Sequence, residues 1–150
     1  MSAEAASAIV VRVVDWAQAA ALAMPLRERV FVVEQGVPAE LEADEWDACS
    51  RHALACTAGA EVVGTGRLLP DGHIGRMAVA AAWRGRGIGA RVLNTLVDAA
   101  RAAGMSEVVL NAQLQAVDFY RRQGFTAYGE IFMDAGIEHV AMRRVLSARG

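Results

Sequence analysis

One stretch, residues 73–104, constrains the fold of this 150-residue chain most strongly. Residues 73–79 are typical of a strand, and an amphipathic helix is predicted from about residue 87. Its apolar face consists of Leu93, Leu96, Val97 and Ala100. Between strand and helix lies the sequence Arg-Gly-Arg-Gly-Ile-Gly at positions 84–89. A glycine-rich turn that opens a helix exposes backbone N–H groups at the positive end of the helix dipole, so the stretch predicts a phosphate-binding site.

Three phosphate-binding patterns can be compared with this turn. A P-loop needs a lysine after its last glycine, and all 15 basic residues of this chain are arginine. Residues 85–90 match the dinucleotide pattern G-x-G-x-x-G/A, but the next predicted strand, 107–111, ends in Asn111 instead of the acid that would hold the ribose. Too little chain follows for a doubly wound sheet. The third pattern, R/Q-x-x-G-x-G/A, is filled by Arg84, Gly87 and Gly89.

Composition narrows the class of protein. A chain of 150 residues predicts one domain with a single substantial core. It contains no apolar run of the roughly 18 residues that a membrane span needs, and its first residues lack the features of a secretion signal. Two cysteines are too few for a disulfide framework and fit a reducing cytoplasm. A net charge of −2 gives no general attraction to nucleic acid.

The predicted elements run strand, helix, three-strand meander, helix, strand, helix and hairpin. The first strand spans residues 9–14, and an Ala-rich helix begins near residue 17. Pro25 should kink or restart this helix, because proline cannot donate a backbone hydrogen bond. Its continuation, to Gly36, would bury Leu26, Val30 and Val33. The remaining segments are strands at 52–57, 61–69, 73–79 and 107–111, a helix at 114–123, and a hairpin of residues 125–133 and 138–145.

A second motif joins the glycine-rich turn. Residues 116–125 read Ala-Val-Asp-Phe-Tyr-Arg-Arg-Gln-Gly-Phe, similar to the pattern A-x-x-F-Y-x-x-x-G-F, and the two motifs flank the strand at 107–111. This arrangement resembles the GNAT family of N-acetyltransferases (GCN5-related), over residues 9–146. Residues 27–35, with acids and His52 after them, further resemble its ElaA-like branch, although Val37-Pro38-Ala39-Glu40 replaces a segment in which that branch usually has a tyrosine. The resemblance implies a single α/β (α+β) domain, residues 1–150, with a mixed central sheet of about seven strands and about four helices.

The resemblance also implies a cosubstrate, acetyl-CoA, and the residues that hold it. Backbone groups of Met77, Ala78 and Val79 would pair with pantetheine in a gap between strands 73–79 and 107–111. Backbone N–H groups of residues 84–90 would bind the pyrophosphate. These residues are Arg84, Gly85, Arg86, Gly87, Ile88, Gly89 and Ala90, with the two arginines as further charged contacts. Asn111 would bond pantetheine or a water, or cap the strand.

Transfer to an amine needs a proton donor for the leaving thiolate and a base for the amine. Tyr120 is the candidate acid, because a phenol stays protonated at neutral pH; the alternative is a core tyrosine. His73 is the candidate base, near where this family often places one. His52, Glu34, Glu42 and Asp44 could also reach the acceptor side, and a water chain could replace all of them. Acids cluster around Trp46 in a predicted loop, residues 39–51, which leans slightly towards a cationic acceptor.

Other chemistry fits the sequence less well. Cys56 lies in an apolar run and is more consistent with a core residue than with an acyl-carrying nucleophile. Cys49 and His52 form a lone C-x-x-H, too few ligands for a metal site. Two functions remain: transfer of an acetyl group from acetyl-CoA to a primary amine, or non-catalytic acyl-CoA binding on the same fold. A different acyl donor or acceptor, and a homodimer, also remain open.

Overall fold

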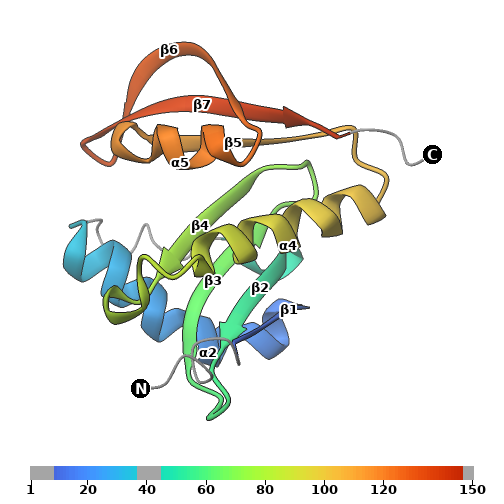
Figure 1. Ribbon diagram of the computed structural model, residues 1–150, viewed down its shortest axis with the longest axis vertical. Helices are drawn as coiled ribbons and strands as arrows, with labels where there is room; N and C mark the ends of the chain where they lie inside the picture. Colours follow the sequence, from blue (N-terminus) through green and yellow to red (C-terminus); the bar gives the residue numbers. More distant parts are fainter. Residues whose placement is uncertain (1–8, 37–44, 147–150) are drawn as a thin grey trace.

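The computed structural model describes residues 9–36 and 45–146, in which the predicted order of elements is confirmed (Figure 1). The strands are β1 (Val10–Val14), β2 (Arg51–Cys56), β3 (Val62–Leu68), β4 (Ile74–Val79), β5 (Glu107–Gln113), β6 (Thr126–Asp134) and β7 (Ile137–Val145). The longer helices are α2 (Trp16–Arg27), the π-helix η1 (Glu28–Glu34), α4 (Ile88–Ala102) and α5 (Val117–Arg122). Short 3₁₀ turns are η2 (Asp47–Cys49), η3 (Ala81–Trp83) and η4 (Leu114–Ala116).

The seven strands form two antiparallel sheets instead of the one continuous mixed sheet that we expected. The first has the order β1-β2-β3-β4 and the second the order β5-β7-β6. A single parallel bridge, between His73 and Val109, joins them within the described residues. Its hydrogen bond runs from the Val109 N–H to the Gly72 carbonyl, 3.1 Å. β4 and β5 therefore start side by side and then diverge, as Figure 1 shows.

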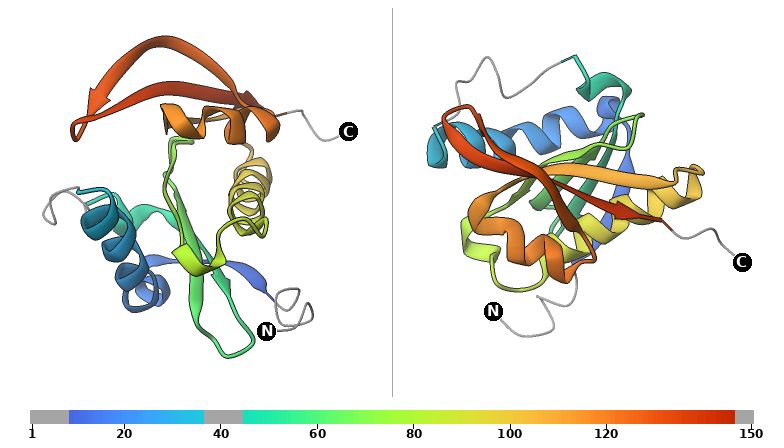
Figure 2. Two further views of the ribbon diagram at one scale, coloured as in Figure 1. Left: turned by 60° about the vertical axis from the view of Figure 1, so that its left-hand side comes forward. Right: turned by 90° about the horizontal axis from the view of Figure 1, so that it is seen from above.

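Helices cover both faces of the first sheet. α2 and α4 lie on opposite sides of it in Figure 2. The predicted apolar face of α4 is confirmed, since Leu93, Leu96 and Val97 are at most 1% exposed. The helix approaches β3 closely because Gly66 has no side chain: a Cβ there would lie 2.9 Å from the Leu96 Cδ1 atom and 2.6 Å from the Met77 Sδ atom. The absent side chain thus lets the middle of α4 pack closely on β3.

Pro25 does not end the first helix, because α2 continues through it to Arg27 and passes directly into the π-helix η1. The wider winding is visible at the end of η1, where the Gln35 N–H bonds to the Val30 carbonyl, five residues earlier. Leu26 and Val30 are buried as expected, but Val33 is 74% exposed and the prediction for it is wrong. A π-helix turns less per residue than an α-helix, so position i+3 leaves the buried face.

Candidate active site

A cleft of about 600 Å³ opens where β4 and β5 diverge. Both strands are edge strands at this point, so each presents one row of backbone N–H and C=O groups to the cleft. Its other walls are the end of η1, the start of α5 and the β6–β7 turn. Lining residues include Phe31, Gln35, His73, Met77, Asn111, Tyr120 and His139.

The glycine-rich turn lies after β4 and opens α4 as predicted. Gly85 and Gly87 both have φ of +79°, and no atom would meet a Cβ at either position within 4 Å. The glycines are therefore needed for backbone conformation and not to relieve crowding. Gly87 is the N-cap and supplies no side-chain hydrogen bond. The first intrahelical bond is from the Arg91 N–H to the Gly87 carbonyl, which leaves the N–H groups of residues 88–90 without a partner among the described residues.

The side chains around this turn already have partners. Arg84 donates from Nε to the Val79 carbonyl, 2.9 Å, and from Nη2 to Glu34 Oε1, 2.8 Å. The guanidinium of Arg86 stacks over the Trp83 ring at 4.9 Å. The Ile88 side chain is buried, so this residue can present only its backbone. Glu34, which was predicted to reach the acceptor side, therefore pairs with Arg84, which was predicted to contact the pyrophosphate. The Val79 carbonyl, which was predicted to pair with pantetheine, accepts a hydrogen bond from Arg84 instead.

Tyr120 lies on α5 and lines the cleft. Its ring packs edge-on against Phe119 at 5.1 Å and against Phe125 at 6.0 Å between centroids. Burial raises the pKa of Tyr120 to about 12, which keeps the phenol protonated at neutral pH. Phe119 packs against the core and lies near Gly89, where a Cβ would be 3.6 Å from its Cζ atom.

β4 is irregular where it lines the cleft. The register with β3 shifts between Thr65 and Arg67, and Arg76 opposite them has φ of +51°, in the left-handed region that side chains rarely adopt. Such a bulge re-aims neighbouring backbone groups, and strained residues concentrate at functional sites. On the opposite side, β5 extends to Gln113, so Asn111 lies within the strand and does not cap it. Gln113 donates to Gln35 of the helix side, 3.0 Å, across the cleft.

Two histidines line the cleft, and only one was predicted. His73 pairs with Asp71, with 2.9 Å between its Nδ1 atom and Oδ1. His139 was missed because nothing in the spacing of β7 distinguishes it from a surface residue. Its Nδ1 atom lies 2.8 Å from the Ile137 carbonyl, and its ring stacks on Phe132 at 5.9 Å.

His52, another residue predicted to reach the acceptor side, does not line the cleft. His52 is 1% exposed: its Nε2 atom lies 2.9 Å from the Asp47 carbonyl oxygen and its ring packs on Trp16 at 4.8 Å. Burial, partly offset by that hydrogen bond, lowers its pKa. The prediction that His52 contacts the acceptor is therefore wrong. Glu42 and Asp44 lie outside the described residues.

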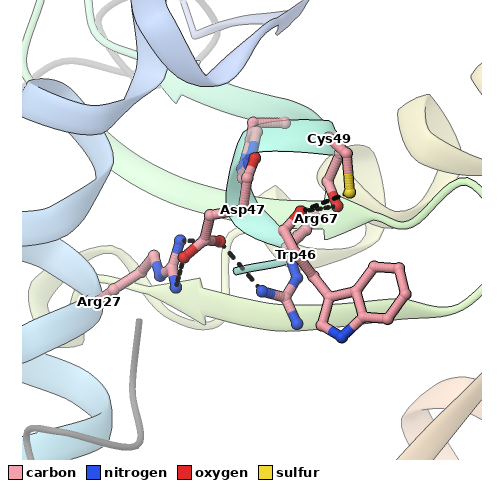
Figure 3. Close-up of polar contacts among 7 residues, drawn as sticks. Arg27, Trp46, Asp47, Cys49 and Arg67 are labelled. Atoms are coloured by element: carbon pink, nitrogen blue, oxygen red, sulfur yellow. Dashed lines mark hydrogen bonds and ion pairs between the residues drawn. The ribbon is translucent and has the colours of Figure 1, made fainter. Parts of the chain in front are cut away.

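A buried ion network lies below the cleft (Figure 3). Asp47 Oδ1 accepts from Arg27 Nη1 at 2.9 Å and from Arg67 Nη1 at 3.0 Å, while Oδ2 accepts from Arg27 Nη2 at 3.2 Å. Arg27 and Asp47 are at most 2% exposed, and Arg67 also lines the cleft. Asp47 thus holds two arginines together and is not a solvated acid, which removes one of the acids that favoured a cationic acceptor.

Neither cysteine is arranged for chemistry. Cys56 is half-buried in β2, and the Cys49 thiol donates to the Trp46 carbonyl, 3.4 Å. Among residues 9–36 and 45–146, no three His, Cys, Asp or Glu residues gather as metal ligands would. No helix in the same part of the chain is long and apolar enough to cross a membrane.

Comparison with protein families decides the class. Residues 13–146 match the model of the acetyltransferase (GNAT) domain. The chain belongs to the GNAT acetyltransferase family. An uncharacterized N-acetyltransferase of Bacillus subtilis, YjcF, is 42% identical over 79% of this chain and 87% of its own length. The chain is therefore an N-acetyltransferase with a single GNAT-type α/β fold.

Two further relatives support the ElaA-like branch and the fold. Escherichia coli ElaA is 32% identical over 81% of this chain and 84% of its own length, and its crystal structure superposes with a TM-score of 0.81. The crystal structure of an acyl-CoA N-acyltransferase from Pseudomonas aeruginosa, 30% identical, covers 91% of this GNAT chain and 99% of its own, also with a TM-score of 0.81.

Proposed function

We propose that this GNAT enzyme transfers an acetyl group from acetyl-CoA to a primary amine by direct attack, without an acyl-enzyme. The observation that carries this proposal is the cleft between the diverging edges of β4 and β5, with the protonated Tyr120 phenol on its wall. The glycine-rich turn and the start of α4 follow the open edge of β4 directly in the chain.

The chain offers a binding group for each part of acetyl-CoA. Backbone N–H groups of residues 88–90 suit the pyrophosphate, because the helix dipole favours negative charge there. Met77, which lines the cleft, suits an amide of pantetheine, because an extended chain adds to a free strand edge. Asn111 is exposed on the facing strand and can donate from its side-chain amide.

Residues of the cleft then serve the reaction. The acceptor amine, in its neutral form, attacks the thioester carbonyl carbon. The bulge at Arg76 and Met77 offers backbone groups that can stabilise the charge that develops on the carbonyl oxygen. Tyr120 donates its proton to the departing thiolate, since its raised pKa disfavours loss of that proton at any earlier stage. His73 takes the proton that the amine loses. A cysteine intermediate has no support, because Cys49 bonds to Trp46 and neither cysteine lines the cleft.

Thiol release with a panel of amines and acetyl-CoA tests this function, with calorimetry of acetyl-CoA binding alongside it. The panel should contain amino acids, polyamines, a lysine peptide and a peptide N-terminus. Amine-dependent release of CoA, with the acetylated amine found by mass spectrometry, is expected. Tight acetyl-CoA binding without turnover on any amine would favour the acyl-CoA-binding module instead. An acetyl-thioester trapped on the protein would contradict direct attack.

A further inference from the structure

Asp71 holds His73 through one carboxylate oxygen, which accepts two hydrogen bonds from His73. Oδ1 accepts from the His73 backbone N–H, 3.0 Å, and lies 2.9 Å from the ring Nδ1 atom. Burial acts to raise the pKa of Asp71, but the hydrogen bonds and charge of His73 outweigh it and lower that pKa. The backbone bond alone would be an ordinary turn contact at Pro70-Asp71-Gly72. The ring contact is additional, and a carboxylate oxygen at this distance favours a proton on Nδ1.

His73 lies at the cleft, so its contact with Asp71 can affect the reaction there. His73 forms the bridge with Val109, so it marks the apex from which β4 and β5 diverge, and it lines the cleft that opens there. Its side chain is 50% exposed, and its Nε2 atom has no hydrogen-bond partner within the part of the chain that the structure describes. Three residues, 74–76, lie between His73 and Met77, and both residues line the cleft of about 600 Å³. The cleft leaves room for an acceptor molecule, or an acceptor and one water, between the imidazole and the bulge.

We propose that Asp71 is a positioning residue: it keeps His73 in the tautomer with the proton on Nδ1, so that Nε2 is the atom that accepts the proton of the acceptor amine. This inference rests on the proposed function. A carboxylate partner suits this task better than a carbonyl does, because it also stabilises the imidazolium that forms. The Nδ1 atom of His139 lies 2.8 Å from the Ile137 carbonyl, and no carboxylate of the described residues pairs with this histidine.

The proton balance is complete with the groups present. The nitrogen–carbon bond forms at the thioester carbonyl, and the nitrogen loses one proton to Nε2 of His73, directly or through one water. The carbon–sulfur bond breaks, sulfur leaves with the electron pair, and it takes the Tyr120 proton. The His73 imidazolium, still held by Asp71, then returns its extra proton through water to the Tyr120 phenolate. The products are the amide and CoA thiol, and both side chains are restored.

Four variants separate positioning from turn structure. Asp71→Ala removes both hydrogen bonds, and Asp71→Asn keeps an acceptor oxygen but removes the charge. His73→Gln removes the base. Asp98→Asn is the matched control, because Asp98 forms an exposed ion pair with Arg101 on α4 and does not line the cleft. Each is measured for kcat, KM for acetyl-CoA and melting temperature, and His73 is observed by ¹⁵N NMR of its ring nitrogens.

The wild type should show the Nδ1–H tautomer of His73, and Asp71→Ala should lose it. Asp71→Ala and Asp71→Asn should each lower kcat by about tenfold or more, as loss of a hydrogen bond to a charged group does. KM for acetyl-CoA should stay within about twofold, and His73→Gln should lose at least as much kcat as Asp71→Ala. Asp98→Asn should match the wild type.

Three results would overturn the inference. One is an unchanged tautomer in Asp71→Ala; another is a changed tautomer with unchanged kcat. The third is a loss of kcat that only accompanies a fall in melting temperature. If the wild type acetylates no amine, the proposed function fails separately, and the NMR measurement still reports whether Asp71 positions His73.

Discussion

Glu34 and Arg84 form an ion pair of 2.8 Å between residues 50 positions apart, one at the end of the π-helix η1 and one in the glycine-rich turn. Arg84 also bonds the last carbonyl of β4, at Val79. The pair thus connects the end of η1, which is one wall of the cleft, to the glycine-rich turn, which we propose as the pyrophosphate site. Both side chains are partly exposed, at 32% and 46%, so the pair can exchange partners at little cost. An arriving phosphate would compete with Glu34 for Arg84.

Glu34→Gln should therefore tighten acetyl-CoA binding by up to about fivefold, because an exposed ion pair is worth about 0.2–1 kcal/mol. Arg84→Gln should weaken binding by about tenfold, since a charged donor to the phosphates is lost. Calorimetry on both variants and on Asp98→Asn measures the three effects. Weaker binding in Glu34→Gln would show that Glu34 holds Arg84 in its binding position and does not compete with the phosphate.

Two variants of Gly87, with side chains of the same shape but different charge, test the phosphate site. Asn and Asp both tolerate the left-handed region and both cap helices, and a Cβ at Gly87 meets no atom within 4 Å. Gly87→Asn and Gly87→Asp should hence fold with melting temperatures close to each other. Only Gly87→Asp places a negative charge at the start of α4, so it should lose acetyl-CoA binding far more completely. Equal affinities in the two variants would place the pyrophosphate elsewhere.

Local patterns predicted most of the fold. The meander, the amphipathic face of α4 and the closing hairpin follow from periodicity and turn residues, which act over a few positions. The family resemblance implied the gap between β4 and β5, but local patterns did not show that this gap divides the strands into two antiparallel sheets. Val33 was wrongly predicted to be buried because the sequence pattern does not distinguish an α-helix from a π-helix. The two helices place residue 33 on different faces.

Local sequence patterns also predicted only part of the candidate active site. The glycine-rich turn and Tyr120 belong to motifs with fixed spacing, and the structure places them on the predicted elements. His52 and Asp47 appear in the sequence as polar residues near an acidic segment, yet both are buried against partners distant in the chain. His139 carries no sequence signal, because tertiary structure alone brings it to the cleft. The contact of Asp71 with the His73 ring is local, but the sequence pattern shows only the turn and not the orientation of the imidazole.

Asp47→Asn should reduce the free energy of unfolding by about 3–5 kcal/mol, the usual cost of removing one partner from a buried ion pair. The amide keeps the shape of the carboxylate but leaves the Arg27 and Arg67 guanidiniums without the negative charge they share. Urea unfolding measures the change, and Asp98→Asn, the same substitution in an exposed pair, should change it by less than about 0.5 kcal/mol. Similar small values for both would mean that the network is solvated in solution.

His52 should make the protein less stable in mild acid. Its pKa is lowered in the folded protein from 6.5, mainly by burial, so the unfolded chain binds the proton more readily. Stability from this residue is present above about pH 6.5 and is lost as the pH falls from there towards the folded pKa. The difference in melting temperature between the wild type and His52→Gln should hence shrink between about pH 7.5 and pH 5.5. A constant difference would show that His52 does not titrate on unfolding.

Tyr120→Phe tests the proton donor most directly. The change removes only the hydroxyl and keeps the ring that packs between Phe119 and Phe125. No described residue forms a hydrogen bond with that hydroxyl, so the melting temperature should change little. General acid catalysis is worth typically 10²–10⁴-fold, and kcat should fall by about that order while the Kd for acetyl-CoA stays within about threefold. A water that replaces the phenol as donor would place the loss at the lower end of this range.

A change of leaving group tests whether the Tyr120 hydroxyl donates its proton to the thiolate. Proton donation to the thiolate matters most when the leaving group is poor. An acyl donor with a more acidic thiol should therefore show a smaller loss of kcat in Tyr120→Phe than acetyl-CoA does. Turnover with acetyl-CoA and with a thioester of a more acidic thiol, each for the wild type and the variant, gives the comparison. Equal losses for both thioesters would mean that the hydroxyl acts on the carbonyl or on substrate position. Full activity of Tyr120→Phe at an unchanged melting temperature would remove Tyr120 from the mechanism, and a large fall in melting temperature would make its hydroxyl a structural partner.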